Sequence, residues 1–181
     1  AVAGLKKELK SRVVRQQKKR VPRLAEEGEI AFEVAADPSI AQAWLSEAMS
    51  MKREWLKSTG RVSRAFMRPA TAACLAEMAW TLARPAASPR MVVSRLSVNG
   101  RTAAIEMGFR HRESYHLYLG AFATEYARLG PGNVLTEHVL DWCAKNGLSR
   151  YDMLPPRSRN KGEWQSGEVA VLDFAMPLSA R

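Results

Sequence analysis

The sequence predicts a single α/β domain in which helices flank a mixed central sheet. A chain of 181 residues is long enough for one domain with a hydrophobic core. Its composition, 46% hydrophobic and 25% charged, is typical of globular proteins. The hydrophobic patterns predict, in order, a helix, a strand, two helices, three strands, a helix and two strands. An element order of this kind indicates a mixed sheet with helices on its faces.

A basic amphipathic helix is predicted at residues 4–20, because a narrow apolar stripe recurs every four residues. We define residues 1–23 as the basic arm and residues 24–181 as the domain that follows it. The arm holds nine Lys and Arg residues and one acid, Glu8, and so carries most of the net charge of +10. Pro22 is expected to end the helix. The stripe consists of Leu5, Leu9, Val13, Val14 and Gln17.

The role of the basic arm has three interpretations. Its apolar stripe is small and has no aromatic residue, which favours docking on the domain or on a neighbouring lobe. A polybasic helix can also bind nucleic acid or an anionic membrane surface. The third interpretation is that its charge attracts an anionic donor or acceptor.

The segment after the arm predicts one strand and two helices. Apolar and polar residues alternate at 29–35, which predicts the strand. Asp37 followed by Pro38 is typical of an N-cap and the first helical position. The helix that follows is expected to end near Gly60. A second helix is expected at about 71–82.

The second half of the chain has strand patterns on both sides of one helix. Asn99 and Gly100 separate two strand-like runs and suit a type I′ hairpin turn. Another strand is expected at 114–123. The next helix runs to about Asn146 and is closed by Gly147, at the position that favours left-handed backbone geometry. The last two strands are expected at 150–154 and 170–176, separated by a polar insert.

The stretch "LGPGNVLTEHVLDW", residues 129–142, begins the helix of the second half. A helix N-terminus exposes unpaired N–H groups and the positive end of a dipole, and glycines let the chain approach a phosphate closely. The alternative is a tight turn in which Asn133 is the N-cap. Local features leave both interpretations open.

Side chains with catalytic chemistry occur close to this stretch. His116 and Tyr118 share one face of an alternating strand, and His116 is a candidate general base. Asp152 stands in the strand after the helix. Lys161 lies in the polar insert, where it can contact a phosphate or an oxyanion as a point charge. The alternatives are a half-buried sheet histidine, a solvated lysine and, for Trp164, a lid over the core.

The cysteines and histidines argue against a disulfide-stabilised protein and against a metalloprotein. Cys74 and Cys143 are expected to be buried free thiols, which fits a reducing, cytoplasmic environment. Peripheral contact with the inner membrane face, through the basic arm, stays open. No metal site is expected, because His111, His116 and His138 lack ligand spacing. The start "AVAGLKKELK" lacks the apolar region of a signal peptide, and no apolar run is long enough to cross a membrane.

Three motifs carry a resemblance to a known family. A Tyr-rich strand leads into "LGPGNVLTEHVLDWCAKNG", and "LSRYDML" is followed by the Lys and Trp of "NKGEW". The third motif is the basic helix, Gly and strand of "LKSRVVRQQKKRVPRLAEEGEIAFEVAAD". From about residue 90 to its end, the chain resembles the GNAT acyltransferase fold. More closely, it resembles the CelD-like acetyltransferases of cellulose and exopolysaccharide synthesis, within the FemAB-related branch.

The resemblance implies transfer of an acyl group from acetyl-CoA to an amine or hydroxyl group of a sugar or similar acceptor. It implies a donor diphosphate on the loop between the central strand and the next helix. Lys161 corresponds to the Lys of the Lys-x-x-Trp ending and is expected to be an electrostatic helper. His116 and Asp152 are the candidate bases, and a backbone N–H of the preceding strand would stabilise the oxyanion. The implied donor-site residues are Arg128, Leu129, Gly130, Pro131, Gly132 and Asn133.

The chain departs from the family pattern in two respects. Ala127 stands where the usual signature has Gln or Arg, and Arg128 is displaced by one residue, so another acyl-CoA remains an alternative donor. The two-lobed relatives are longer, so the chain is expected to be their C-terminal lobe. A binding module whose basic arm contacts nucleic acid or an anionic surface is the alternative to an enzyme.

Overall fold

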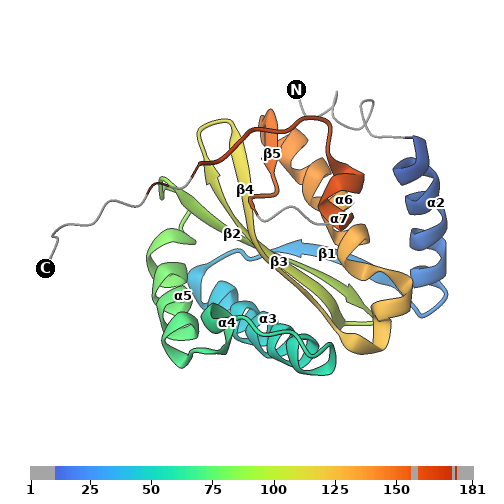
Figure 1. Ribbon diagram of the computed structural model, residues 1–181, viewed down its shortest axis with the longest axis horizontal. Coiled ribbons are helices and arrows are strands. Elements are labelled where there is room, and N and C mark those ends of the chain that lie inside the picture. Colours follow the sequence, from blue (N-terminus) through green and yellow to red (C-terminus); the bar gives the residue numbers. More distant parts are fainter. Residues whose placement is uncertain (1–10, 156–158, 173, 175–181) are drawn as a thin grey trace, which may run out of the picture.

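A five-stranded mixed sheet in the order β1-β2-β3-β4-β5 forms the centre of the protein (Figure 1). The computed structural model describes residues 11–155, 159–172 and 174. Strands β1 to β4 are antiparallel neighbours, whereas β5 pairs with β4 in parallel. The predicted mixed sheet is therefore confirmed. The strands are β1 Ile30–Val34, β2 Arg90–Val98, β3 Arg101–His111, β4 Ser114–Phe122 and β5 Arg150–Asp152.

Helices cover both faces of the sheet and divide the core into two layers (Figure 1). Alternate residues of β2 serve the two layers: Met91 and Val93 pack with α3 and α5, whereas Val92 and Leu96 pack with α2 and α6. One face carries α3 Pro38–Ser58, α4 Arg64–Met67 and α5 Pro69–Leu82, and the other carries α2 Ser11–Ala25 and α6 Pro131–Lys145. Because the central strands β2 and β3 bury both faces, the predicted class of helices flanking a sheet follows from their side-chain alternation.

Local signals predicted two elements accurately. The Asp37 Oδ1 accepts hydrogen bonds from the Ser39 and Ile40 amides at 2.8 and 3.0 Å, and Pro38 occupies the first position of α3. Asn99 and Gly100 both have positive φ, 49° and 76°, as a type I′ hairpin requires. Both elements depend on residues close in sequence, which is why their prediction succeeds.

The prediction that α2 ends before Pro22 is wrong. The helix continues to Ala25, with Pro22 inside its last turns. Leu24 is fully buried in the core beside α6. Burying such a side chain is worth about 2 kcal/mol, which offsets most of the roughly 3 kcal/mol that a helical proline costs. The predicted start, including Leu5 and Leu9, lies outside the described residues.

Other departures from the sequence predictions occur around the second half of the chain. A 3-10 helix, η1 Thr124–Leu129, precedes α6, and a short helix, α7 Arg159–Trp164, interrupts the polar insert. Residues 170–172 form no strand, and part of the predicted strand at 170–176 lies outside the described residues.

Cys143 is buried as expected, but Cys74 is exposed because it lies on the outer side of α5. None of the helices in the described residues has the length and hydropathy needed to cross a membrane.

Strand β4 contains a bulge that requires Gly108 on its partner strand. Met107 pairs with Leu119 and Gly108 pairs with Leu117, so Tyr118 has no opposite residue on β3. A Cβ atom on Gly108 would overlap the Tyr115 ring and lie 2.6 Å from the His116 carbonyl oxygen. The glycine therefore allows β3 to lie directly against the bulged part of β4, its neighbour in the sheet.

We expect Gly108→Ala to lower the free energy of unfolding by about 1–3 kcal/mol, because a backbone carbonyl must move to make room. Urea denaturation measures the difference. Gly120→Ala is the matched control on β4, since a Cβ there meets nothing within 4 Å. Equal stability of the two variants would show that the bulge tolerates a side chain at position 108.

Candidate functional site

Strands β4 and β5 separate after a short paired segment, and this leaves an open strand edge. They pair only from Ser114 to His116 on β4 and from Arg150 to Asp152 on β5. β4 then continues to Phe122, whereas β5 ends. In the described part of the chain, no strand covers this edge of β4 beyond His116. A backbone edge of this kind offers hydrogen-bond donors and acceptors to a ligand.

The backbone groups of Gly120 point toward this open edge. The Ala123 amide donates to the Ala103 carbonyl at 3.0 Å, which marks a hydrogen-bonded pair between β4 and β3. Bonded and non-bonded pairs alternate along antiparallel strands, so Gly120, opposite Glu106, belongs to a non-bonded pair. Its N–H and C=O therefore face away from β3. The N–H is free to donate to a developing oxyanion.

Two predicted site residues meet where the strands begin to separate. The parallel register places His116 beside Asp152, and the Nδ1 of His116 lies 3.5 Å from the Oδ2 of Asp152. The other carboxylate oxygen of Asp152 accepts from the Leu154 amide at 2.8 Å. The side chains are 32% and 43% exposed, so a ligand can reach them. A carboxylate on Nδ1 orients the imidazole and leaves Nε2 for proton transfer.

Lys161 joins this cluster from α7. Its Nζ donates to the Leu154 carbonyl at 2.7 Å. Burial lowers the pKa of Lys161, while the charge of Asp152 acts in the opposite direction. The indole N–H of Trp164 donates to the Oδ1 of Asn133 at 3.0 Å and ties α7 to the start of α6. The structure thus brings together His116, Asp152 and Lys161, which are far apart in sequence.

The alternative interpretation, in which Asn133 is the N-cap of α6, is wrong. The N-cap position is Gly130, in left-handed geometry with φ 66°, and Pro131 begins the helix. Proline favours the first helical position, which shifts the start ahead of Asn133. The Asn133 side chain instead accepts from Trp164. No side chain caps the helix, so its first turn remains open to an anion while Arg128 stands exposed at the end of η1.

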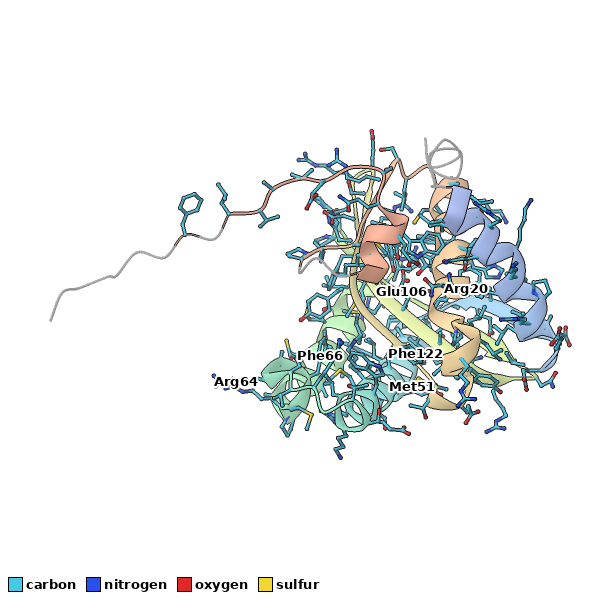
Figure 2. The ribbon with its side chains drawn as sticks, turned by 45° about the vertical axis from the view of Figure 1, so that its right-hand side comes forward. Arg20, Met51, Arg64, Phe66, Glu106 and Phe122 are labelled. Atoms are coloured by element: carbon cyan, nitrogen blue, oxygen red, sulfur yellow. The ribbon has the colours of Figure 1, made fainter. Side chains whose placement is uncertain are left out.

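A cation that the sequence did not assign to the site lies beside this turn. Arg20 of α2 is so close to Gly130 that a Cβ there would be 3.2 Å from its Nε (Figure 2). Its Nη1 donates to the Oε1 of Gln17 at 3.0 Å, and the Nε2 of Gln17 donates to the Asn133 carbonyl at 2.7 Å. Gln17 is only 4% exposed. Gln17, a polar residue within the apolar stripe of the arm, was the one feature of the sequence that indicated this contact between α2 and the start of α6.

Lys52 of α3 is a second residue that sequence reasoning missed. Its Nζ lies 3.4 Å from the Gly120 carbonyl and 4.7 Å from the centre of the Trp55 ring. Burial lowers the pKa of Lys52, and the positive charges of Lys161 and Arg61 lower it further. The open edge of β4 is therefore lined by cations from both α3 and α7. Nothing in the helical pattern of α3 distinguishes this lysine from a solvated one.

Glu106 forms a buried polar cluster between β3, β5 and α6 (Figure 2). The hydroxyl group of Tyr151 donates to its carboxyl oxygen at 2.8 Å, and that of Thr136 lies at 3.4 Å. Burial raises the pKa of Glu106 to about 7, although these hydrogen bonds favour the ionised form. Because only 3% of its surface is exposed, Glu106 does not reach a ligand. Its hydrogen bonds instead connect β3 to β5 and to α6.

Comparisons with known proteins agree with this geometry. A family model described as an acetyltransferase (GNAT) domain matches residues 11–163. No curated protein sequence matches the chain.

Solved structures share the fold at low sequence identity. The ribosomal-protein-S18-alanine N-acetyltransferase of Escherichia coli is 17% identical with a TM-score of 0.51, over 75% of this chain and 74% of that one. An aminoglycoside acetyltransferase from an uncultured soil metagenomic sample is 12% identical with a TM-score of 0.53, over 83% and 97%. A structure described as a possible acetyltransferase from Clostridium difficile 630 is 14% identical with a TM-score of 0.53, over 83% and 97%. At these identities the likeness is one of fold.

Proposed function

The chain belongs to the acetyltransferase (GNAT) domain family, and we propose that it transfers an acetyl group from acetyl-CoA to a small acceptor. The observation that carries the proposal is the separation of β4 and β5, which begins at the His116–Asp152 pair and leaves the edge of β4 exposed toward Gly120. A donor thioester in this gap would meet both a candidate base and a backbone N–H. The acceptor would react through an amine or a hydroxyl group.

The donor diphosphate is proposed to bind at the turn formed by residues 128–133. The uncapped first turn of α6 supplies the Gly132 N–H group and the positive end of the helix dipole. Arg20 supplies a full positive charge beside Gly130. This charge compensates for Ala127, which stands where the family signature usually has Gln or Arg. Other acyl-CoA donors remain alternatives, because these contacts address the diphosphate and not the acyl group.

The proposed reaction is direct transfer. The acceptor nitrogen or oxygen attacks the thioester carbonyl carbon while the Nε2 of His116 takes its proton. Negative charge that develops on the carbonyl oxygen is stabilised by the Gly120 N–H, with Lys161 as an electrostatic helper. The carbon–sulfur bond then breaks, and the CoA thiolate leaves and takes up a proton. Asp152 stabilises the imidazolium that forms in the first step.

The position of α2 favours the enzyme over a binding module with a separate basic arm. Val13 and Leu24 are buried in the core, and Arg20 turns toward the donor turn. The narrower proposals are a sugar acceptor and a place in the CelD-like, FemAB-related branch of polysaccharide synthesis. Both proposals remain predictions. The expected cytoplasmic location, the expected second lobe, and binding of nucleic acid or an anionic membrane by residues 1–23 also remain predictions.

We expect acetyl-CoA to raise the melting temperature, because ligand at 100 times its Kd stabilises the folded state by about 2.7 kcal/mol. Arg20→Ala should weaken acetyl-CoA binding about tenfold by removing a charge-assisted contact with the diphosphate. Binding of S-acetylpantetheine, which has no diphosphate, should not change. Differential scanning fluorimetry over a ligand titration measures both.

Lys19→Ala is the matched control, since Lys19 is an exposed neighbour on α2. It should bind acetyl-CoA as the unmodified protein does. The absence of stabilisation by any acyl-CoA would contradict the proposed donor. An equal loss in both variants would show a general effect of charge instead of a contact made by Arg20.

A further inference from the structure

Basic residues are concentrated in a second segment, far from the arm in sequence. Residues 52–68 contain six Lys or Arg residues and a single acid, Glu54. Glu54 offsets only one of these six charges, and its carboxylate accepts from the Thr124 hydroxyl group at 3.2 Å. The six basic residues are Lys52, Arg53, Lys57, Arg61, Arg64 and Arg68.

The end of α3 accounts for only part of this charge. Lys57 lies in the last turn of α3, where a cation offsets the helix dipole. The guanidinium of Arg53 donates to the Phe66 carbonyl at 3.0 Å and connects α3 to α4. Arg61, Arg64 and Arg68 lie beyond α3, so its dipole does not explain them. We call these three residues the basic rim.

Two cations of this segment, Lys52 and Arg61, lie against the same Trp55 ring close to the open edge of β4. The Trp55 ring has Lys52 Nζ at 4.7 Å and the Arg61 guanidinium at 5.2 Å from its centre. Lys52 in turn reaches the Gly120 carbonyl. Burial lowers the pKa of Lys52, and the positive charges of Lys161 and Arg61 lower it further. Among the described residues, no carboxylate forms an ion pair with Lys52 or with the basic rim.

A hollow beside the basic rim lies next to the candidate base. Its volume is about 430 Å³, within the range of about 300–1,000 Å³ that is typical of small-molecule sites. Leu75, Met78, Phe109 and Tyr118 give it an apolar wall, and Arg68 is its charged lining residue. Phe109 is the cross-strand neighbour of His116. We call this space the α5 hollow.

We propose that the acceptor is a small anionic molecule, whose phosphate or carboxylate group binds at Arg64 and Arg68 while its apolar part enters the α5 hollow. This inference rests on the proposed function, since it names the class of acceptor for the same reaction centre. An anion offsets the repulsion among these cations and is attracted to them from a distance. A polycationic acceptor would instead be repelled. Arg64 is exposed, and Figure 2 shows it at the outer side of α4.

Isothermal titration of the CoA-saturated protein tests the proposal with four probes: phenyl phosphate, benzoate, benzyl alcohol and benzylamine. CoA occupies the donor turn, so an anionic probe is left with the acceptor side. We expect at least one anionic probe to bind about tenfold or more tightly than benzyl alcohol, a difference of about 1.4 kcal/mol. Benzylamine should bind most weakly. The tighter of the two anionic probes identifies phosphate or carboxylate as the recognised group.

The variant Arg64→Ala/Arg68→Ala should lose the preference for anions. Neither side chain has a hydrogen bond or ion pair within the described ranges, so the fold should persist, and unchanged CoA binding verifies this. Arg84→Ala/Lys145→Ala removes two exposed charges, one just beyond α5 and one in the last turn of α6, and should keep the preference. The Nε of Arg84 donates only to the Trp80 carbonyl of α5, and unchanged CoA binding verifies the fold of this variant as well. Equal binding of charged and neutral probes, no binding of either anion, or the same loss in both variants overturns the inference. Failure of CoA to bind would contradict the proposed function itself, and with it the acceptor role.

Discussion

Replacing His116 with Asn is expected to lower kcat by about 100-fold or more, with a smaller change in KM for acetyl-CoA. General-base catalysis typically contributes about 10²- to 10⁴-fold, and no neutral imidazole would remain at this position to take the acceptor proton. The measurement is the release of CoA thiol with the best amine or hydroxyl acceptor from a panel. Asp152→Asn should lower kcat less, because the imidazole remains but loses the carboxylate that orients it at 3.5 Å.

His111→Asn is the matched control for this substitution. His111 is exposed at the end of β3, directly before the turn to β4, and lies outside the separation between β4 and β5. Its replacement should leave kcat unchanged. If His116→Asn kept nearly full kcat, the base would have to be another group. Lys52, whose lowered pKa makes the neutral amine more accessible, would then be the next residue to test.

The second large effect is a fall in stability with rising pH that originates at Glu106. Burial raises the pKa of this carboxyl group from 4.5 to about 7, so the folded protein holds a proton that the unfolded chain releases. Where the folded state binds more protons, the free energy of unfolding falls as pH rises. The contribution of Glu106 is therefore largest below pH 4.5, falls between about pH 4.5 and 7, and levels off above. The total is about 3 kcal/mol.

Glu106→Gln isolates this contribution, because the amide keeps the shape of the side chain but does not ionise. We expect the stability of the unmodified protein, relative to the variant, to fall by about 2–3 kcal/mol between pH 5 and pH 8. Urea denaturation at a series of pH values measures the difference. Glu26→Gln, at an exposed carboxylate, should change stability equally at all these pH values. Parallel curves for Glu106→Gln and the unmodified protein would show that Glu106 ionises as it does in the unfolded chain.

The helical and hairpin signals that succeeded are local ones. Asp37 caps α3 by accepting from amides two and three residues further along the chain. The conformation of Asn99 and Gly100 depends on the turn that they form themselves. The interactions that decide such elements lie within a few residues, so the sequence contains them directly. One prediction failed because a distant contact overrides a local rule: Leu24 draws α2 past Pro22 into the core. Asn133 does not cap α6 for a local reason, since Pro131 occupies the first position of the helix.

The candidate site likewise contains residues that the sequence predicted and residues that it did not. Its predicted members, His116, Asp152 and Lys161, were recognised from residue type and from motifs that resemble a family. Arg20, Lys52 and Glu106 carried no such signal. Each acquires its chemistry from neighbours that lie far away in sequence: Gly130 for Arg20, Gly120 for Lys52, and Tyr151 for Glu106.

The sequence by itself determined the class of this protein, one α/β domain, the order of its main elements from α2 to β5, and a helix within residues 129–142. Alternating hydrophobicity and local turn chemistry are sufficient for these features, because they act between near neighbours. Only the tertiary structure decided that β4 and β5 separate beyond His116, and that α2 and α3 bring Arg20 and Lys52 to the exposed backbone. Electrostatic and hydrogen-bonding interactions act over a few ångströms in space, whatever the separation along the chain, so they become visible only after folding.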